Sequence, residues 1–157
     1  MSFSFNPERK QQFKTLLKRY PDKRSATLPA LHLAQEQEGH LSGDTIAAVA
    51  EMLDISAAEI MDTASFYTMF YRVPQGKYKL QVCQTLSCSL AGADELVDYI
   101  SSVRKIRVGE TSADGKFTLL KVECLGSCGT GPVIQINDDY YENMTINKLE
   151  RIMGKLV

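Results

Sequence analysis

Apolar residues at helical spacing dominate the chain up to about residue 70. Phe13 and Leu16 lie three residues apart on one side of the first such segment. They follow Asn6 and Pro7, which are typical of a helix N-cap and of the first helical residue. The pattern predicts a helix that starts at this cap and ends before Pro21.

Three further helices are expected in this part of the chain. One spans residues 29–38. The next is capped by Ser42, and the last begins at a capping box formed by Ser56 and Glu59. These helices predict an N-terminal bundle over residues 1–73.

Beyond Pro74 and Gly76 the hydrophobic period changes from helical to alternating. Tyr78, Leu80 and Val82 alternate with polar residues, as in a half-buried strand. The pattern then predicts a helix at 93–103, strands at 116–124, 132–137 and 140–143, and a final helix capped by Thr145. The cis or trans state of the bond before Pro132 stays open at this stage.

The order of these elements predicts the sheet. The first two strands are joined through a helix, which implies parallel pairing, and the last two are joined by a short turn at residues 137–139, which implies antiparallel pairing. The expected fold class is therefore α/β with a mixed sheet of the α+β kind. Residues 74–157 should form a thioredoxin-like domain behind the helical bundle.

Composition narrows the class of protein. With 44% hydrophobic and 24% charged residues and a net charge of −1, the chain is typical of a globular protein and offers no basic surface for nucleic acid. Uninterrupted apolar stretches fall short of the about 20 residues that cross a bilayer, and the first residues lack the pattern of a secretory signal. We therefore expect a cytoplasmic protein that does not insert into the membrane. In that compartment, cysteines favour metal binding or redox chemistry over disulfides.

The four cysteines, Cys83, Cys88, Cys124 and Cys128, form two short-loop pairs. Each pair begins at the end of a predicted strand, and ligands gather at the carboxyl ends of neighbouring strands in sheets that carry helices. Four converging thiolates suit either zinc or an iron–sulfur cluster. The C-x₄-C and C-x₃-C spacings favour a [2Fe–2S] cluster, which is wider than a single ion, and leave a structural zinc site as the alternative.

Glycines surround the second pair. Gly126, Gly129 and Gly131 are expected to allow positive φ and to bring backbone N–H groups close to sulfur. Lys and Arg are absent from both cysteine loops, which favours a low reduction potential for a cluster. The glycines are in the wrong order for a nucleotide-binding loop, and the C-x-x-C of a thioredoxin-type dithiol is missing. We identify no catalytic residues.

Three segments carry a family resemblance: "QVCQTLSCSLAGADEL", "KVECLGSCGTGPVIQINDDYYENMT" and "ASFYTMFYRVPQGKY". They resemble the thioredoxin-like [2Fe–2S] component of respiratory complex I, the NADH:quinone oxidoreductase, which is often called the E subunit in bacteria. The resemblance runs from about residue 10 to the C-terminus. It implies one [2Fe–2S] cluster with Cys83, Cys88, Cys124 and Cys128 as ligands.

The resemblance also implies a partner and a place in a larger enzyme. It implies docking on a subunit that binds FMN and NADH, with single electrons exchanged between the FMN and the cluster. This chain would be a non-catalytic, electron-carrying subunit in the peripheral arm of a membrane-bound complex. Similar subunits serve NAD-linked hydrogenases and formate dehydrogenases, which stay open as hosts, and a zinc-stabilised assembly module without redox activity is the alternative of a different class.

The Met-rich and aromatic segment "MDTASFYTMFY", residues 61–71, contains more large apolar side chains than a small bundle can bury. We therefore expect the helical region to supply much of the surface that docks on the flavin-binding partner.

Overall fold

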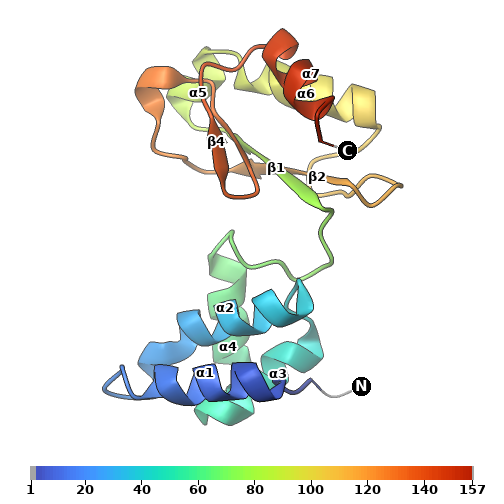
Figure 1. The fold of residues 1–157 in the computed structure, drawn as a ribbon. Helices are drawn as coiled ribbons and strands as arrows, with labels where there is room; N and C mark the ends of the chain where they lie inside the picture. Colours follow the sequence, from blue (N-terminus) through green and yellow to red (C-terminus); the bar gives the residue numbers. More distant parts are fainter. Residues whose placement is uncertain (1–2, 157) are drawn as a thin grey trace. The chain divides into compact units, whose positions relative to one another are not determined.

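The computed structural model describes residues 3–156, which divide into two compact units. The first unit ends at Pro74 and the second begins at Gln75. The sequence placed this boundary one residue earlier. The first unit is built from helices and the second combines a sheet with helices (Figure 1).

The helical unit contains α1 (Pro7–Leu17), α2 (Thr27–Glu38), α3 (Gly43–Leu53) and α4 (Ala57–Phe66). A single 3₁₀ turn, Arg24–Ala26, leads into α2. The central helix α2 packs against α1, α3 and α4. Its Leu31 is fully buried, together with Leu53 of α3 and Ile60 of α4. The predicted bundle therefore has a core of its own.

Local capping explains where these helices begin. The Asn6 side chain accepts a hydrogen bond from the Arg9 N–H at 2.8 Å, and the Ser42 hydroxyl accepts one from the Thr45 N–H at 3.2 Å. Both predicted N-caps are confirmed. The second helix starts at Thr27, two residues before its predicted first residue. The residues that precede it are already helical in the 3₁₀ turn.

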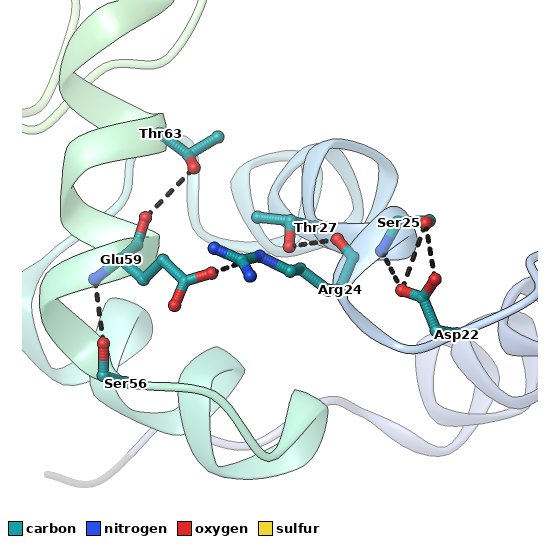
Figure 2. A network of polar contacts seen from close by, with 7 residues as sticks. All are labelled: Asp22, Arg24, Ser25, Thr27, Ser56, Glu59 and Thr63. Atoms are coloured by element: carbon teal, nitrogen blue, oxygen red, sulfur yellow. Dashed lines mark hydrogen bonds and ion pairs between the residues drawn. The ribbon is translucent and has the colours of Figure 1, made fainter.

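Only half of the predicted capping box forms. The Ser56 hydroxyl accepts a hydrogen bond from the Glu59 N–H at 3.2 Å, as expected. The Glu59 carboxylate, however, pairs with the Arg24 guanidinium at 2.6 Å (Figure 2). An ion pair that joins the 3₁₀ turn to α4 thus takes the place of the bond back to the cap. Sequence reasoning missed it because Arg24 is distant in the chain.

In the second unit, the strands β1 (Tyr78–Cys83), β2 (Phe117–Val122), β3 (Ile134–Ile136) and β4 (Asp139–Tyr141) form one sheet in the order β2-β1-β3-β4. β1 pairs with β2 in parallel, while β3 pairs antiparallel with both β1 and β4. The predicted mixed sheet is therefore confirmed. Because β1 and β2 are parallel, the chain leaves both strands at the same edge of the sheet.

Helices α5 (Leu86–Leu90), α6 (Ala93–Arg104) and α7 (Ile146–Met153) complete this unit. α6 packs against β1, β2 and α7 (Figure 1). The core is apolar and includes Leu80, Leu119 and Ile134 from the sheet. The Thr145 side chain accepts a hydrogen bond from the Lys148 N–H, which confirms the predicted cap of α7.

Candidate metal centre

The end of β1 and the end of β2 carry the first cysteine of each pair. Cys83 is the last residue of β1 and stands opposite Val122, the last residue of β2. Cys124 lies two residues beyond Val122. The Cys83 sulfur is 4.0 Å from the Glu123 carbonyl oxygen. The parallel register therefore brings the first cysteine of each pair to the same edge of the sheet.

The second cysteine of each pair lies on a short turn of helix. Cys88 is buried in α5, and Cys128 opens the 3₁₀ turn Cys128–Thr130 and is exposed. Burial raises the pKa of the Cys88 thiol, and the hydrogen bond to Cys83 and the charges of Cys83 and Cys128 raise it further. Cys88 is thus close to a cysteine of each pair. All four thiols are free.

Backbone N–H groups point at the Cys83 sulfur. Burial alone raises the pKa of this thiol, but hydrogen bonds from the backbones of Thr85 and Leu125 and from the side chains of Cys88 and Thr85 outweigh burial, so its pKa lies below the ordinary value. Leu125 belongs to the loop that follows β2, while Cys83 ends β1. Donors from both cysteine loops therefore favour a thiolate at this position.

Backbone N–H groups also donate hydrogen bonds to the sulfurs of Cys124 and Cys88. The Gly126 N–H donates to the Cys124 sulfur at 3.3 Å, with Gly126 at a φ of +74°. The Val133 backbone donates to Cys88 and partly offsets the rise of its pKa. The glycine donor expected next to sulfur is confirmed at Gly126.

The same expectation fails at two glycines. Gly129 and Gly131 do not adopt positive φ. Gly131 serves a different purpose, because a Cβ built on it would lie 3.3 Å from the Cys88 sulfur. A close approach of the chain to Cys88, and not a left-handed backbone, therefore explains the absence of a side chain there. The Gly131–Pro132 peptide bond is cis, which settles the state that the sequence left open.

Within residues 3–156, no group of three or more His, Cys, Asp or Glu side chains is placed to hold one metal ion. A [2Fe–2S] cluster has a different requirement, since four cysteines are shared between two irons. The structure meets two requirements of such a site: the cysteine pairs follow two parallel strands at one edge of the sheet, and backbone N–H groups donate to sulfur. The residues present therefore fit such a cluster.

The structure also adds a polar contact that sequence reasoning missed. The Glu142 carboxylate accepts hydrogen bonds from the hydroxyls of Ser127 and Thr130, the second at 2.7 Å. These two residues flank Cys128 and Gly129 in the chain. No local pattern marks this contact, because Glu142 follows β4 and lies far along the chain from Ser127.

The exposed His32 ring of the helical unit contacts Phe70, with 4.9 Å between ring centroids. Over the part of the chain that the structure describes, none of the helices is both long and apolar enough to cross a membrane.

The second unit is a mixed sheet, and a cysteine pair follows each of its two parallel strands. These features place the chain in the class of thioredoxin-like iron–sulfur proteins. The sequence model of the family described as "Thioredoxin-like [2Fe-2S] ferredoxin" matches residues 13–157. The chain is a member of this family. The resemblance and the fold class inferred from the sequence are confirmed.

Curated relatives extend the match over nearly the whole chain, and all three named here are components of NADH-quinone oxidoreductase. Subunit 2 of the enzyme from Thermus thermophilus is 46% identical over 151 residues, which are 94% of this chain and 83% of the relative. The E 2 subunit from Rhizobium meliloti is 40% identical, covering 92% of this chain and 86% of the relative. The E subunit from Rickettsia typhi is 43% identical, covering 97% and 91%. The chain is thus homologous to components of an oxidoreductase.

Among solved structures, the NAD⁺-reducing [NiFe]-hydrogenase in the air-oxidised state matches with a TM-score of 0.69 and 20% identity. The match covers 81% of this chain and 22% of the hydrogenase chain, so this chain spans about a fifth of that chain's length. At this identity the match supports the fold.

Proposed function

We propose that this chain is the electron-transfer subunit of an NADH:quinone oxidoreductase and that Cys83, Cys88, Cys124 and Cys128 hold one [2Fe–2S] cluster. The observation that carries the proposal is the convergence of both cysteine pairs at the ends of two parallel strands, with N–H donors on their sulfurs. Family membership and the names of the relatives support the host enzyme.

The cluster supplies reversible uptake of one electron when it is bound. The chain's own contribution is to hold the thiolates and to set their surroundings. Cys83 is favoured as a thiolate by its N–H donors, and Gly126 donates to the sulfur of Cys124. Cys88 is buried on the core side, whereas Cys124 and Cys128 are exposed. The exposed pair therefore marks the side from which an electron donor can approach.

The partner in this proposal is the subunit of the same complex that binds FMN and NADH. The chain exchanges single electrons with the flavin and performs no catalysis of its own. It resides in the peripheral arm of the complex on the cytoplasmic side. The names of the curated relatives support an oxidoreductase assembly, and the exposed apolar residues of the helical unit support docking on another protein.

The cluster is tested on anaerobically purified full-length protein. We expect charge-transfer absorption in the visible range, and iron and acid-labile sulfide in equal amounts. After dithionite, a rhombic S = 1/2 EPR signal should appear. Colourless protein that binds one zinc per chain would reject the redox function in favour of the assembly module.

Ligand assignment is tested by Cys→Ser substitution at each of the four positions. Cys124→Ser should weaken or abolish cluster binding, because serine is a poorer ligand for iron than a thiolate. The matched control is Ser87→Ala, which removes an exposed hydroxyl from the other cysteine loop but no sulfur. A Cys124→Ser protein with wild-type absorption and EPR would remove this residue from the ligand set.

A further inference from the structure

In the loop that carries Cys124 and Cys128, Leu125 packs against the core of the second unit, whereas Cys128 itself is exposed. Val122 and Pro132 are buried, but none of the residues 123–131 between them is buried. The 3₁₀ turn Cys128–Thr130 likewise has no buried residue. An exposed loop of this kind has few contacts that resist local opening. Polar contacts therefore contribute to fixing the position of Cys128.

Those polar contacts converge on the segment that follows β4. The Glu142 carboxylate accepts from the Ser127 and Thr130 hydroxyls. The next residue, Asn143, donates its N–H to the Thr130 carbonyl at 2.6 Å. The N–H of Met144 donates to the Pro132 carbonyl at 3.0 Å. Glu142, Asn143 and Met144 thus bind the turn that carries Cys128 and the residues that follow it.

This segment is itself anchored in the core. Met144 is 3% exposed and belongs to the hydrophobic cluster of the second unit. Thr145 then caps α7, and the Lys148 ammonium of that helix donates to the Glu142 carbonyl at 2.5 Å. A continuous path of contacts therefore runs from the core through Met144 and Glu142 to the turn that carries Cys128.

Charge gives Glu142 a second effect on the site. The Glu142 carboxylate adds negative charge next to cysteine loops that contain no Lys or Arg, and the Lys148 ammonium, which contacts the same residue, offsets part of that charge. The Ser127 and Thr130 hydroxyls also direct their protons to Glu142, and a proton engaged there is not donated to sulfur. Negative charge nearby and fewer hydrogen bonds to sulfur both favour the oxidised form of an iron–sulfur cluster.

We propose that Glu142 is a positioning residue for the cluster site: its carboxylate fixes the turn that carries Cys128, and its charge lowers the reduction potential of the cluster. The inference rests on the [2Fe–2S] cluster proposed above. It assigns to Glu142 a task that involves no bond to iron. Glutamine at this position can still accept from both hydroxyls but lacks the charge, whereas alanine lacks both.

The experiment uses the full-length protein with its cluster and compares Glu142→Gln, Glu142→Ala and the control Glu150→Gln. Glu150 on α7 accepts a hydrogen bond from the hydroxyl of Tyr99 on α6 at 2.6 Å, so its variant also removes one negative charge from this unit but no contact with a cysteine loop. Two quantities are measured: the rate of cluster loss to an iron chelator, followed by visible absorption, and the midpoint potential, followed by EPR during a redox titration.

Glu142→Ala should lose its cluster about 10-fold faster than the wild type or more, the usual cost of removing a group that orients a metal ligand. Glu142→Gln should retain the cluster at close to the wild-type rate and shift the midpoint potential to a more positive value. Glu150→Gln should match the wild type in both. Wild-type cluster loss in Glu142→Ala, or a wild-type potential in Glu142→Gln, would overturn the proposal.

Failure of the proposed function gives a different result. In that case the wild-type protein itself shows neither the absorption nor the EPR signal, and no comparison of variants arises. A wild type with a normal cluster and variants without the stated differences would refute the role of Glu142 alone. The thermal unfolding of the metal-free proteins, measured in parallel, separates loss of the cluster site from loss of the fold.

Discussion

At the residue scale, the two glycines that frame Thr130 differ in the space around them. A Cβ on Gly131 would lie 3.3 Å from the Cys88 sulfur and 3.6 Å from its Cα atom. A Cβ on Gly129 would meet nothing within 4 Å. Neither backbone is left-handed, so alanine is allowed at both positions by φ. The pair therefore isolates the effect of one methyl group against Cys88.

We expect Gly131→Ala to displace Cys88 and to speed cluster loss to a chelator about 10-fold, a typical effect of disturbing a ligand through its neighbour. Gly129→Ala is the matched control and should behave like the wild type. The measurement is the decay of visible absorption under chelator. Equal decay in the two variants would show that the close contact with Cys88 has no effect on the cluster.

A second residue-scale prediction concerns Asp114 in the turn before β2. The Ser112 hydroxyl donates to its carboxylate at 2.5 Å, and the Lys116 N–H donates at 3.0 Å. These hydrogen bonds, the first above all, lower the pKa of Asp114. Because the folded-state pKa is below the unfolded one, the ionised carboxylate stabilises the fold above the unfolded pKa of about 3.9, and this contribution is lost as pH falls through the folded pKa.

Asp114→Asn should therefore reduce the loss of stability of the metal-free protein between about pH 4 and pH 2. Asparagine keeps an acceptor oxygen for both donors but does not titrate. Urea midpoints measured across this range provide the test. Part of the slope of stability against pH remains in the variant, because the pKa values of Asp22, Asp94 and Glu142 are also lowered. An unchanged slope would mean that Asp114 contributes nothing to it.

The cysteines of the candidate site could be predicted from sequence, but their surroundings could not. Cys83 and Cys124 follow strand patterns that the alternation of side chains makes visible. The donors to sulfur from Leu125 and Val133 are backbone groups, which any residue type supplies. Glu142 reaches the site through tertiary pairing. The cysteines in the sequence therefore indicated a thiolate site, while the fold determined which groups lie next to the sulfurs.

At the element scale, prediction succeeded where local interactions decide. The caps at Asn6, Ser42 and Thr145 formed because each depends on a side chain and an N–H within three residues. The short helix α5 was not expected, since five residues are too few to show helical periodicity. Its N-cap residue, Thr85, makes no side-chain capping bond. Tertiary position, and not propensity, accounts for this helix.

The entry to β1 supplies a prediction at this scale. A Cβ on Gly76 would lie 2.9 Å from the Lys116 carbonyl carbon and 2.9 Å from the Phe117 nitrogen. Both are backbone atoms at the start of β2, so they cannot move away as a flexible side chain can. The Gly76 N–H also donates to the Thr118 hydroxyl at 2.7 Å. A side chain at position 76 must therefore disturb the first residues of the parallel pair.

Gly76→Ala should destabilise the second unit by about 1–3 kcal/mol, the usual cost of inserting a methyl group where there is no room. Gly43→Ala in α3 is the control, because its Cβ would meet nothing within 4 Å and alanine favours a helix. Chemical denaturation of the metal-free variants gives both values. A Gly76→Ala protein as stable as the wild type would mean that the start of β2 can shift freely.

At the scale of the whole molecule, each unit has its own hydrophobic core, but the helical unit leaves large apolar side chains exposed at and after the end of α4. Phe66 is 78% exposed and Val73 is 58% exposed. Met61, Tyr67 and Met69 are exposed as well. The sequence predicted this excess of apolar residues. Such a group is typical of an interaction surface, and in the proposed function its occupant is the FMN- and NADH-binding subunit.

Phe66 is the best single test of that docking surface. Its ring makes an edge-on contact with Tyr67, with 5.0 Å between centroids, but is mostly open to solvent. Phe66→Ala should therefore leave the unfolding free energy of the isolated chain within about 0.5 kcal/mol of the wild type. Aromatic residues are over-represented among the side chains that dominate binding energy. We expect the same change to weaken binding to the purified flavin-binding subunit at least about 10-fold, or about 1.4 kcal/mol.

The control for this prediction is Val108→Ala, which truncates a side chain that is 46% exposed in the second unit. It should affect neither stability nor binding. Affinities are measured by titration calorimetry with cluster-loaded protein, so that loss of the cluster cannot imitate loss of docking. If Phe66→Ala binds as tightly as the wild type, and deletion of residues 1–70 is equally without effect, the sheet unit alone makes the contact. The exposed residues of the helical unit would then serve another partner.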